Sequence, residues 1–149
     1  MTDLSGMDLD WFFATKDGKI IHLATAGGDV PTEVDEYYLD DVADVLGELD
    51  GDDYDYIINP DLENILKAND RKPIMKYYLE TFIDMAKMGI FSFDRSDING
   101  NSNNYHFVAG PKDKFLSAND IQELKDCILV ANKDIELSTF NIDEIQFNK

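Results

Sequence analysis

The stretch from Asp29 to Glu63 constrains the fold of this chain more than any other feature of its sequence. It contains 14 acidic residues and no lysine or arginine. The formal net charge of the chain is −18, so this stretch supplies most of the net charge. Because like charges repel, such a segment folds only if its apolar residues share one face and its acids stay in water.

Residues 32–49 show this division and predict one amphipathic helix. Thr32 and Asp35 resemble a capping box at its start, with Asp in place of the usual Glu. The apolar face carries Val34, Tyr38, Val42, Val45 and Leu49, with Leu46 beside them. The outer face carries Glu33 and an unbroken i, i+4 row of Glu36, Asp40, Asp44 and Glu48. Like charges at this spacing destabilise a helix by about 0.2–0.5 kcal/mol per pair.

Two interpretations of this acidic row remain open, namely solubility alone or a surface that binds a basic partner. The helix at 73–89 is a useful comparison, because its outer face mixes both signs of charge. Tyrosines lie among the acids, with Tyr37 at the edge of the apolar face and Tyr54 and Tyr56 flanking the acidic turn at 50–55. The predicted partner-binding residues are Glu36, Tyr37, Asp40, Asp44, Glu48, Asp52, Asp53, Tyr54 and Asp55.

Length and composition limit the remaining possibilities. A chain of 149 residues with 44% apolar residues predicts a single globular domain over 1–149. The single cysteine, Cys127, excludes an internal disulfide framework and is typical of a reducing compartment. No signal peptide or membrane-spanning segment is recognisable, so a cytoplasmic protein is expected. The negative charge argues against nucleic acid and anionic membranes as direct partners.

Hydrophobic patterning predicts an α+β fold. Residues 9–15 and 19–25 read as strands joined by the tight turn at Asp17 and Gly18, and residues 90–93 and 105–109 as a second, long-looped hairpin. Helices are expected from Asn59 to Ala68, from Pro73 to Gly89, and from a Ser117 cap to Lys125. After Cys127, two further strands are expected at 127–131 and 135–140 and a short element at 142–147. We therefore expect a mostly antiparallel sheet of about four to six strands, with three to four helices packed against it.

Few residues favour catalysis or cofactor binding. His22 and His106 lie on predicted strands and would form a metal or acid–base pair only if those strands were neighbours. Cys127 has no catalytic motif around it and reads as a buried structural thiol. Asp50, Asp52, Asp53 and Asp55 are better explained as a solvated turn than as a cation site. The loop after Asp94 lacks both essential EF-hand ligands, and Gly27 and Gly28 lack phosphate-loop spacing, so no metal or cofactor is predicted.

Two segments also carry a resemblance to known proteins. They are Asp10-Trp11-Phe12-Phe13-Ala14-Thr15-Lys16-Asp17-Gly18-Lys19-Ile20 with Thr25-Ala26-Gly27-Gly28, and Gly89-Ile90-Phe91-Ser92-Phe93-Asp94 with Tyr105-His106-Phe107-Val108-Ala109-Gly110-Pro111. They resemble a family of small uncharacterised bacterial proteins that are similar to the immunity proteins of toxin systems. The resemblance implies a protein that blocks a toxin by binding it, and it transfers no functional residues.

Three functions are therefore expected as alternatives. The first is a non-enzymatic binding protein for a basic partner such as a nuclease toxin, which the acidic face would attract. The second is a hydrolase or metal-binding enzyme built on His22, His106 and nearby acids. The third is an acidic domain without a dedicated toxin partner, in which the charge serves solubility.

Overall fold

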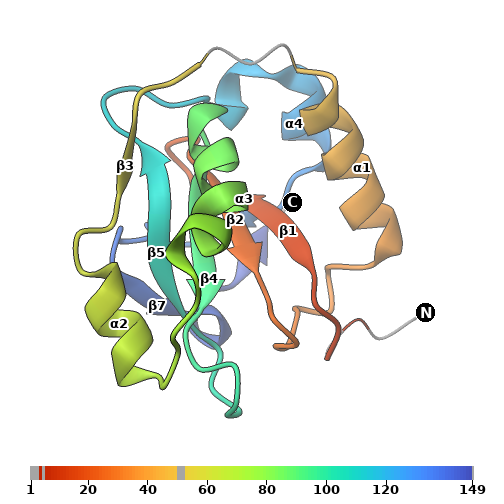
Figure 1. The fold of residues 1–149 in the computed structure, drawn as a ribbon. Helices are drawn as coiled ribbons and strands as arrows, with labels where there is room; N and C mark the ends of the chain where they lie inside the picture. Colours follow the sequence, from red (N-terminus) through yellow and green to blue (C-terminus); the bar gives the residue numbers. More distant parts are fainter. Residues whose placement is uncertain (1–3, 5, 50–52, 149) are drawn as a thin grey trace.

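A computed structural model describes residues 4, 6–49 and 53–148, and it has the predicted α+β fold (Figure 1). The strands are β1 (Asp10–Ala14), β2 (Ile20–Ala24), β3 (Tyr56–Ile58), β4 (Phe91–Arg95), β5 (Asn104–Pro111), β6 (Val130–Ala131), β7 (Thr139–Asn141) and β8 (Phe147–Asn148). The α-helices are α1 (Glu36–Gly47), α2 (Leu62–Ala68), α3 (Met75–Lys87) and α4 (Gln122–Cys127). Two short 3₁₀ helices are η1 (Ala118–Asp120) and η2 (Ile142–Glu144).

The strands of the described residues form one mixed sheet. Its order is β3-β5-β4-β2-β1-β6-β8, and β7 also pairs with β5, so the sheet has eight strands rather than four to six. Both predicted hairpins, β1–β2 and β4–β5, are antiparallel. Among the described residues, five of the seven strand pairs are antiparallel, so the sheet is mostly antiparallel as predicted, whereas β2–β4 and β1–β6 are parallel. Parallel neighbours need long crossovers, and here segments containing helices separate the partners along the chain.

The two faces of the sheet bury different clusters of side chains. The larger cluster gathers Trp11, Phe13, Leu23 and Phe93 with the apolar faces of α1 and α4. The smaller cluster joins α2 and α3 to β5, with Phe82 of α3 at only 7% exposure. Helices thus cover both faces, which explains why the central strands carry apolar residues at successive positions.

The helix α1 begins later than predicted. Asp35 is its N-cap and accepts a 2.8 Å hydrogen bond from the amide of Tyr38, whereas Thr32 donates only to the side chain of Glu33. The predicted capping by Thr32 is therefore wrong. Tyr38 anchors the helix, because its hydroxyl donates to the carbonyl of Phe12 (2.6 Å) and accepts from the amide of Leu129 (3.0 Å).

Three other boundaries also needed the structure. The helix expected from Ser117 to Lys125 consists of η1 and α4, because Ile121 is extended between them (φ −121°, ψ 104°). Beyond Cys127 the two expected strands shrink to β6 and β7, and the tail element divides into η2 and β8. The helix α3 begins at Met75 rather than Pro73, and Gly89 (φ +89°) ends it as predicted.

Candidate functional site

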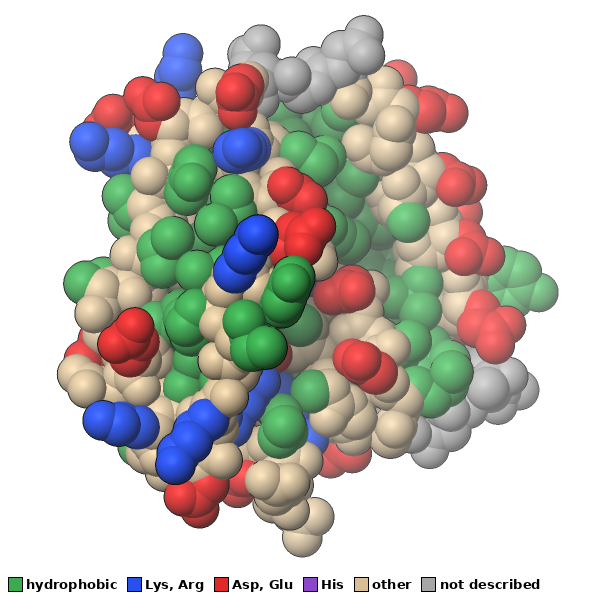
Figure 2. Space-filling model, viewed as in Figure 1, with side chains coloured by type: hydrophobic (Ala, Val, Ile, Leu, Met, Phe, Trp, Pro, Cys, Tyr) green, Lys and Arg blue, Asp and Glu red, His purple; other side chains and the backbone are tan. Residues whose placement is uncertain are grey.

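The acidic row lies on the solvent side of α1, as its helical phase predicts. Glu36, Asp40, Asp44 and Glu48 are all exposed, while Tyr38, Val42 and Leu46 are buried beneath them. Figure 2 shows acidic side chains along the edge formed by α1, with no lysine or arginine among them. None of the ion pairs in the described part of the chain includes an acid of α1. In the part of the chain that the structure describes, no ion pair therefore offsets the negative charge of this helix.

Tyr37 is the aromatic residue that accompanies this row. It is 81% exposed, more than any other exposed large apolar side chain in the described residues. The sequence placed it at the edge of the apolar face, but in the structure its ring stands in solvent next to Glu36. An exposed tyrosine offers a large, rigid contact area with little entropy to lose on binding.

The turn after α1 adds less to this surface than the sequence predicted. Asp52 lies outside the described residues, and Asp53 and Asp55 are exposed. Tyr54 is half-buried and its amide donates to the carbonyl of Lys87 at the end of α3 (2.9 Å). Residues 53–56 line an open hollow of about 460 Å³ together with Lys87 and Lys112, so two cations lie beside the acids there. Among the described residues of the predicted site, only the acids on α1 therefore lie without a lysine or arginine beside them.

The two histidines considered as a catalytic or metal pair, His22 and His106, lie on the face of the sheet that α3 covers. Their strands, β2 and β5, are not neighbours, because β4 lies between them. On β4, Ser92 lies opposite His22 and Asp94 lies opposite His106. The Nδ1 atom of His22 lies 2.9 Å from the hydroxyl of Ser92, and its Nε2 atom lies 2.7 Å from the carboxylate of Asp10. This set has the residue types of a nucleophilic triad, but both Ser92 and His22 are 0% exposed.

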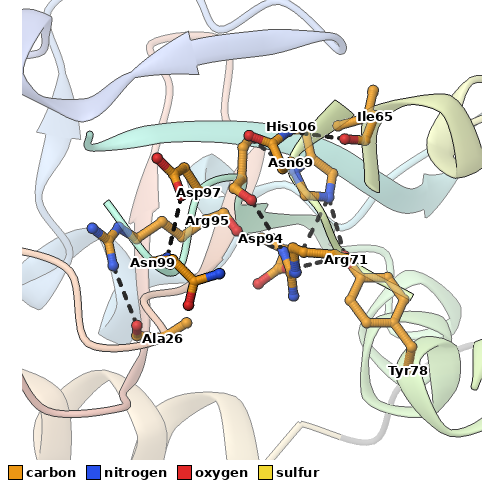
Figure 3. A network of polar contacts seen from close by, with 11 residues as sticks. Ala26, Ile65, Asn69, Arg71, Tyr78, Asp94, Arg95, Asp97, Asn99 and His106 are labelled. Carbon is orange, nitrogen blue, oxygen red and sulfur yellow. Dashed lines mark hydrogen bonds and ion pairs between the residues drawn. The ribbon is translucent and has the colours of Figure 1, made fainter. Parts of the chain in front are cut away.

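His106 belongs to a second polar group, centred on Asp94 (Figure 3). The Oδ2 atom of Asp94 accepts from Arg71 Nη1 (2.8 Å) and from the Tyr78 hydroxyl (2.7 Å). His106 Nε2 lies 3.0 Å from the Tyr78 oxygen, and His106 Nδ1 lies 2.9 Å from the Ser96 hydroxyl. Because Tyr78 donates to Asp94, its oxygen accepts from His106, which places the imidazole proton on Nε2.

Burial controls the protonation of this group. It lowers the pKa of His106 to about 4, and the nearby charge of Arg71 acts in the same direction. Burial raises the pKa of Asp94, although Arg71 and Tyr78 favour its ionised form. Burial and the Asp94 carboxylate both raise the pKa of Tyr78. At neutral pH the group therefore holds a neutral histidine and an un-ionised tyrosine.

The polar group around Asp94 connects secondary-structure elements by hydrogen bonds, and its reactive atoms are not accessible to a substrate. Arg71 precedes α3 and also donates to the carbonyl of Arg95 (2.9 Å), so it joins the α2–α3 turn to β4. Asp94 and His106 are 4% and 0% exposed, which leaves no room for a substrate in contact with them. The sequence identified His106, but it missed Arg71, Tyr78 and Asp94. The available signal was Asp94, a charged residue at the end of an otherwise apolar strand pattern.

The remaining candidates have simple outcomes. Within the described residues, no three His, Cys, Asp or Glu side chains gather closely enough to hold a metal ion. Asp50 and Asp52, in the turn that the sequence assigns to solvent rather than to a cation, lie outside those residues. Cys127 is half-buried against the main core, whereas the sequence predicted a buried structural thiol. No helix in the described residues combines the length and the apolar character that crossing a bilayer requires.

No family model, curated protein or solved structure matches this chain. The resemblance to immunity proteins therefore stays a prediction.

Proposed function

We propose that this chain is a binding protein whose acidic α1 face contacts a basic protein partner. The observation that carries the proposal is the row Glu36, Asp40, Asp44 and Glu48, exposed and without a cation in ion-pair reach among the described residues. Such a row lowers helix stability, so a binding role explains its presence better than folding does. Tyr37 beside it adds an exposed aromatic anchor.

The partner class that best suits this surface is a toxin with a basic substrate-binding surface, such as a nuclease. An immunity protein acts by occupying its toxin, and opposite potentials accelerate encounter and fix orientation. Neither buried histidine group supports a catalytic alternative, because the atoms that would react are enclosed.

The test first isolates a partner by pull-down from the source organism and then measures the dissociation constant of that partner by calorimetry at two salt concentrations. The double variant Asp40→Lys with Asp44→Lys is expected to weaken binding by about 100-fold and to flatten the salt dependence. Tyr37→Ala should weaken it by about tenfold.

The matched control is Glu80→Lys with Asp84→Lys, which makes the same charge change on the exposed face of α3. It is expected to change affinity by less than about threefold, apart from long-range steering. Equal losses in both double variants would show that only net charge matters. Unchanged affinity in the α1 variant would overturn this placement of the site.

A further inference from the structure

The strand β3 forms one edge of the sheet and is unusually apolar for that position. Its three residues, Tyr56, Ile57 and Ile58, are 38%, 39% and 37% exposed. Figure 1 shows β3 on the side of the molecule opposite α1, and Figure 2 shows hydrophobic side chains gathered on that side. The edge is therefore a different surface from the acidic face proposed above.

The backbone of β3 presents free hydrogen-bonding groups outward. Asn59 donates to Val108 of β5 (2.9 Å) and Lys112 donates to the carbonyl of Asp55 (2.8 Å). Because pairing alternates along an antiparallel ladder, Ile57 faces β5, while the amides and carbonyls of Tyr56 and Ile58 point away from it. The proline opposite Tyr56, Pro111, has no N–H and fits this register. Among the described residues, nothing pairs with the outer side of β3.

The charges around this edge select the class of partner. Asp53 and Asp55 precede the strand, Asp61 and Glu63 follow it, and all four are exposed. Lys87 and Lys112 balance only part of this charge. A second copy of the chain would bring another formal charge of −18 against the same edge, so self-pairing is unfavourable.

We infer that β3 is a strand-addition site for an extended, basic polypeptide segment. The segment would hydrogen-bond to the backbone of Tyr56 and Ile58, cover the three apolar side chains, and place its cations beside the flanking acids. Edge strands are usually protected by their shortness or by a lysine, a proline or a bulge, and β3, although only three residues long, contains none of the last three.

The experiment follows amide hydrogen exchange by NMR while the full chain is titrated with a capped peptide of alternating lysine and valine, up to about 1 mM. The amides of Tyr56 and Ile58 are expected to exchange about tenfold more slowly with peptide, while the amide of Ile57 changes little because it already bonds to β5. The same peptide N-methylated at alternate amides should give no slowing.

Ile58→Pro provides the structural control, since it removes an outward N–H and keeps the bonds of Ile57 and Asn59 to β5. It should abolish the slowing at Tyr56 while the melting temperature stays close to that of the parent. Ile74→Ser, which alters an exposed apolar residue (68%) outside the edge, should leave peptide binding unchanged.

Several results would overturn the inference. No slowing at Tyr56 and Ile58 at the highest peptide concentration removes the site. Equal slowing by a glutamate–valine peptide removes the basic class of partner. Protection that rises with protein concentration alone, with a dimer in sedimentation, assigns the edge to a second copy. The Asp40→Lys, Asp44→Lys variant should keep the peptide response, so this test and that of the α1 face fail independently.

Discussion

His106 is a single buried residue that makes the stability of this fold depend on pH. Its two ring nitrogens bond to Ser96 and Tyr78, and its pKa is lowered to about 4 from the ordinary value of 6.5. Above pH 6.5 the imidazole is neutral in both the folded and the unfolded chain, so it adds no pH dependence. Below that value the unfolded chain binds a proton that the folded chain excludes.

We therefore predict that His106 makes the protein less stable as the pH falls from about 6.5 to 4, by about 2–3 kcal/mol in total. His106→Gln keeps a donor for Tyr78 and cannot bind the proton. Its free energy of unfolding should be lower than that of the parent at neutral pH, but should fall less steeply towards acid. Urea titrations at neutral pH and near pH 4.5 measure the difference.

Asp94 has a raised pKa and acts in the opposite direction, because the folded chain takes up its proton first. Asp94 is present in both the parent and the His106→Gln variant. The difference between the pH dependences of their free energies of unfolding therefore reports on His106. Parallel slopes for parent and variant would show that His106 titrates normally in the folded chain.

The sequence identified His106 but not its role, for a reason that applies to most buried polar groups. Arg71, Tyr78 and Asp94 are separated along the chain and meet only because α3 crosses β4 and β5. Spacing within a segment predicts which face a residue occupies, and it says nothing about which other segment covers that face. The prediction of an exposed acidic row on α1 needed no partner and was confirmed.

At the scale of elements, α1 and α3 differ in the charges on their exposed faces, which are acidic on α1 and of both signs on α3. Asp44 has acidic neighbours four residues away on both sides, Asp40 and Glu48, and lies near the negative end of the helix dipole. Glu80 of α3 instead lies between Lys76 and Asp84. The same substitution at these two positions should therefore have different effects.

We predict that Asp44→Lys stabilises the protein by about 1 kcal/mol at low salt, since it turns two repulsive pairs into attractive ones. Glu80→Lys exchanges one attractive pair for another and should change stability by less than about 0.5 kcal/mol. Thermal unfolding in dilute buffer compares the two variants with the parent. An equal gain in both would mean that overall charge, rather than its arrangement on α1, limits stability.

The apolar face of α1 was predictable because 3.6-residue periodicity is a local property. Its start was not, since Val34 fits the helical phase and is buried, yet it lies in a turn in which its amide donates to Pro31 (3.0 Å). The extended Ile121 that separates η1 from α4 carries little sequence signal of its own, because a β-branched side chain lowers helix propensity only slightly.

At the scale of the molecule, 31 acids against 13 lysines and arginines make self-repulsion a property of the whole fold. We predict that raising sodium chloride from about 0.02 M to 0.5 M raises the melting temperature by about 3–6 °C, because the screening length falls from about 20 Å to 4 Å. The Asp40→Lys, Asp44→Lys variant should gain less. A salt-independent melting temperature would mean that ion binding already neutralises the folded chain.

The strand order could not be predicted from the sequence for the same reason as the buried polar group around Asp94. Both depend on which distant segments pack against each other. Hairpins form between neighbours in the chain, so β1–β2 and β4–β5 could be predicted from turn signals. The parallel pairs β2–β4 and β1–β6 depend on helices packing over the sheet, and β6 and β8 are too short to show alternation.

The place of β1 in this sheet has a consequence for how the protein is made. The first strand pairs on one side with β2, its neighbour in the chain, and on the other side with β6, which in turn pairs with β8. During synthesis β1 and β2 emerge early, but the outer edge of β1 stays open until Val130 and Ala131 of β6 have left the ribosome, and β6 in turn waits for β8. A nascent chain therefore carries an incomplete sheet while the residues between β2 and β6 are made, and the non-local pairing that completes the sheet is the kind of step that slows folding.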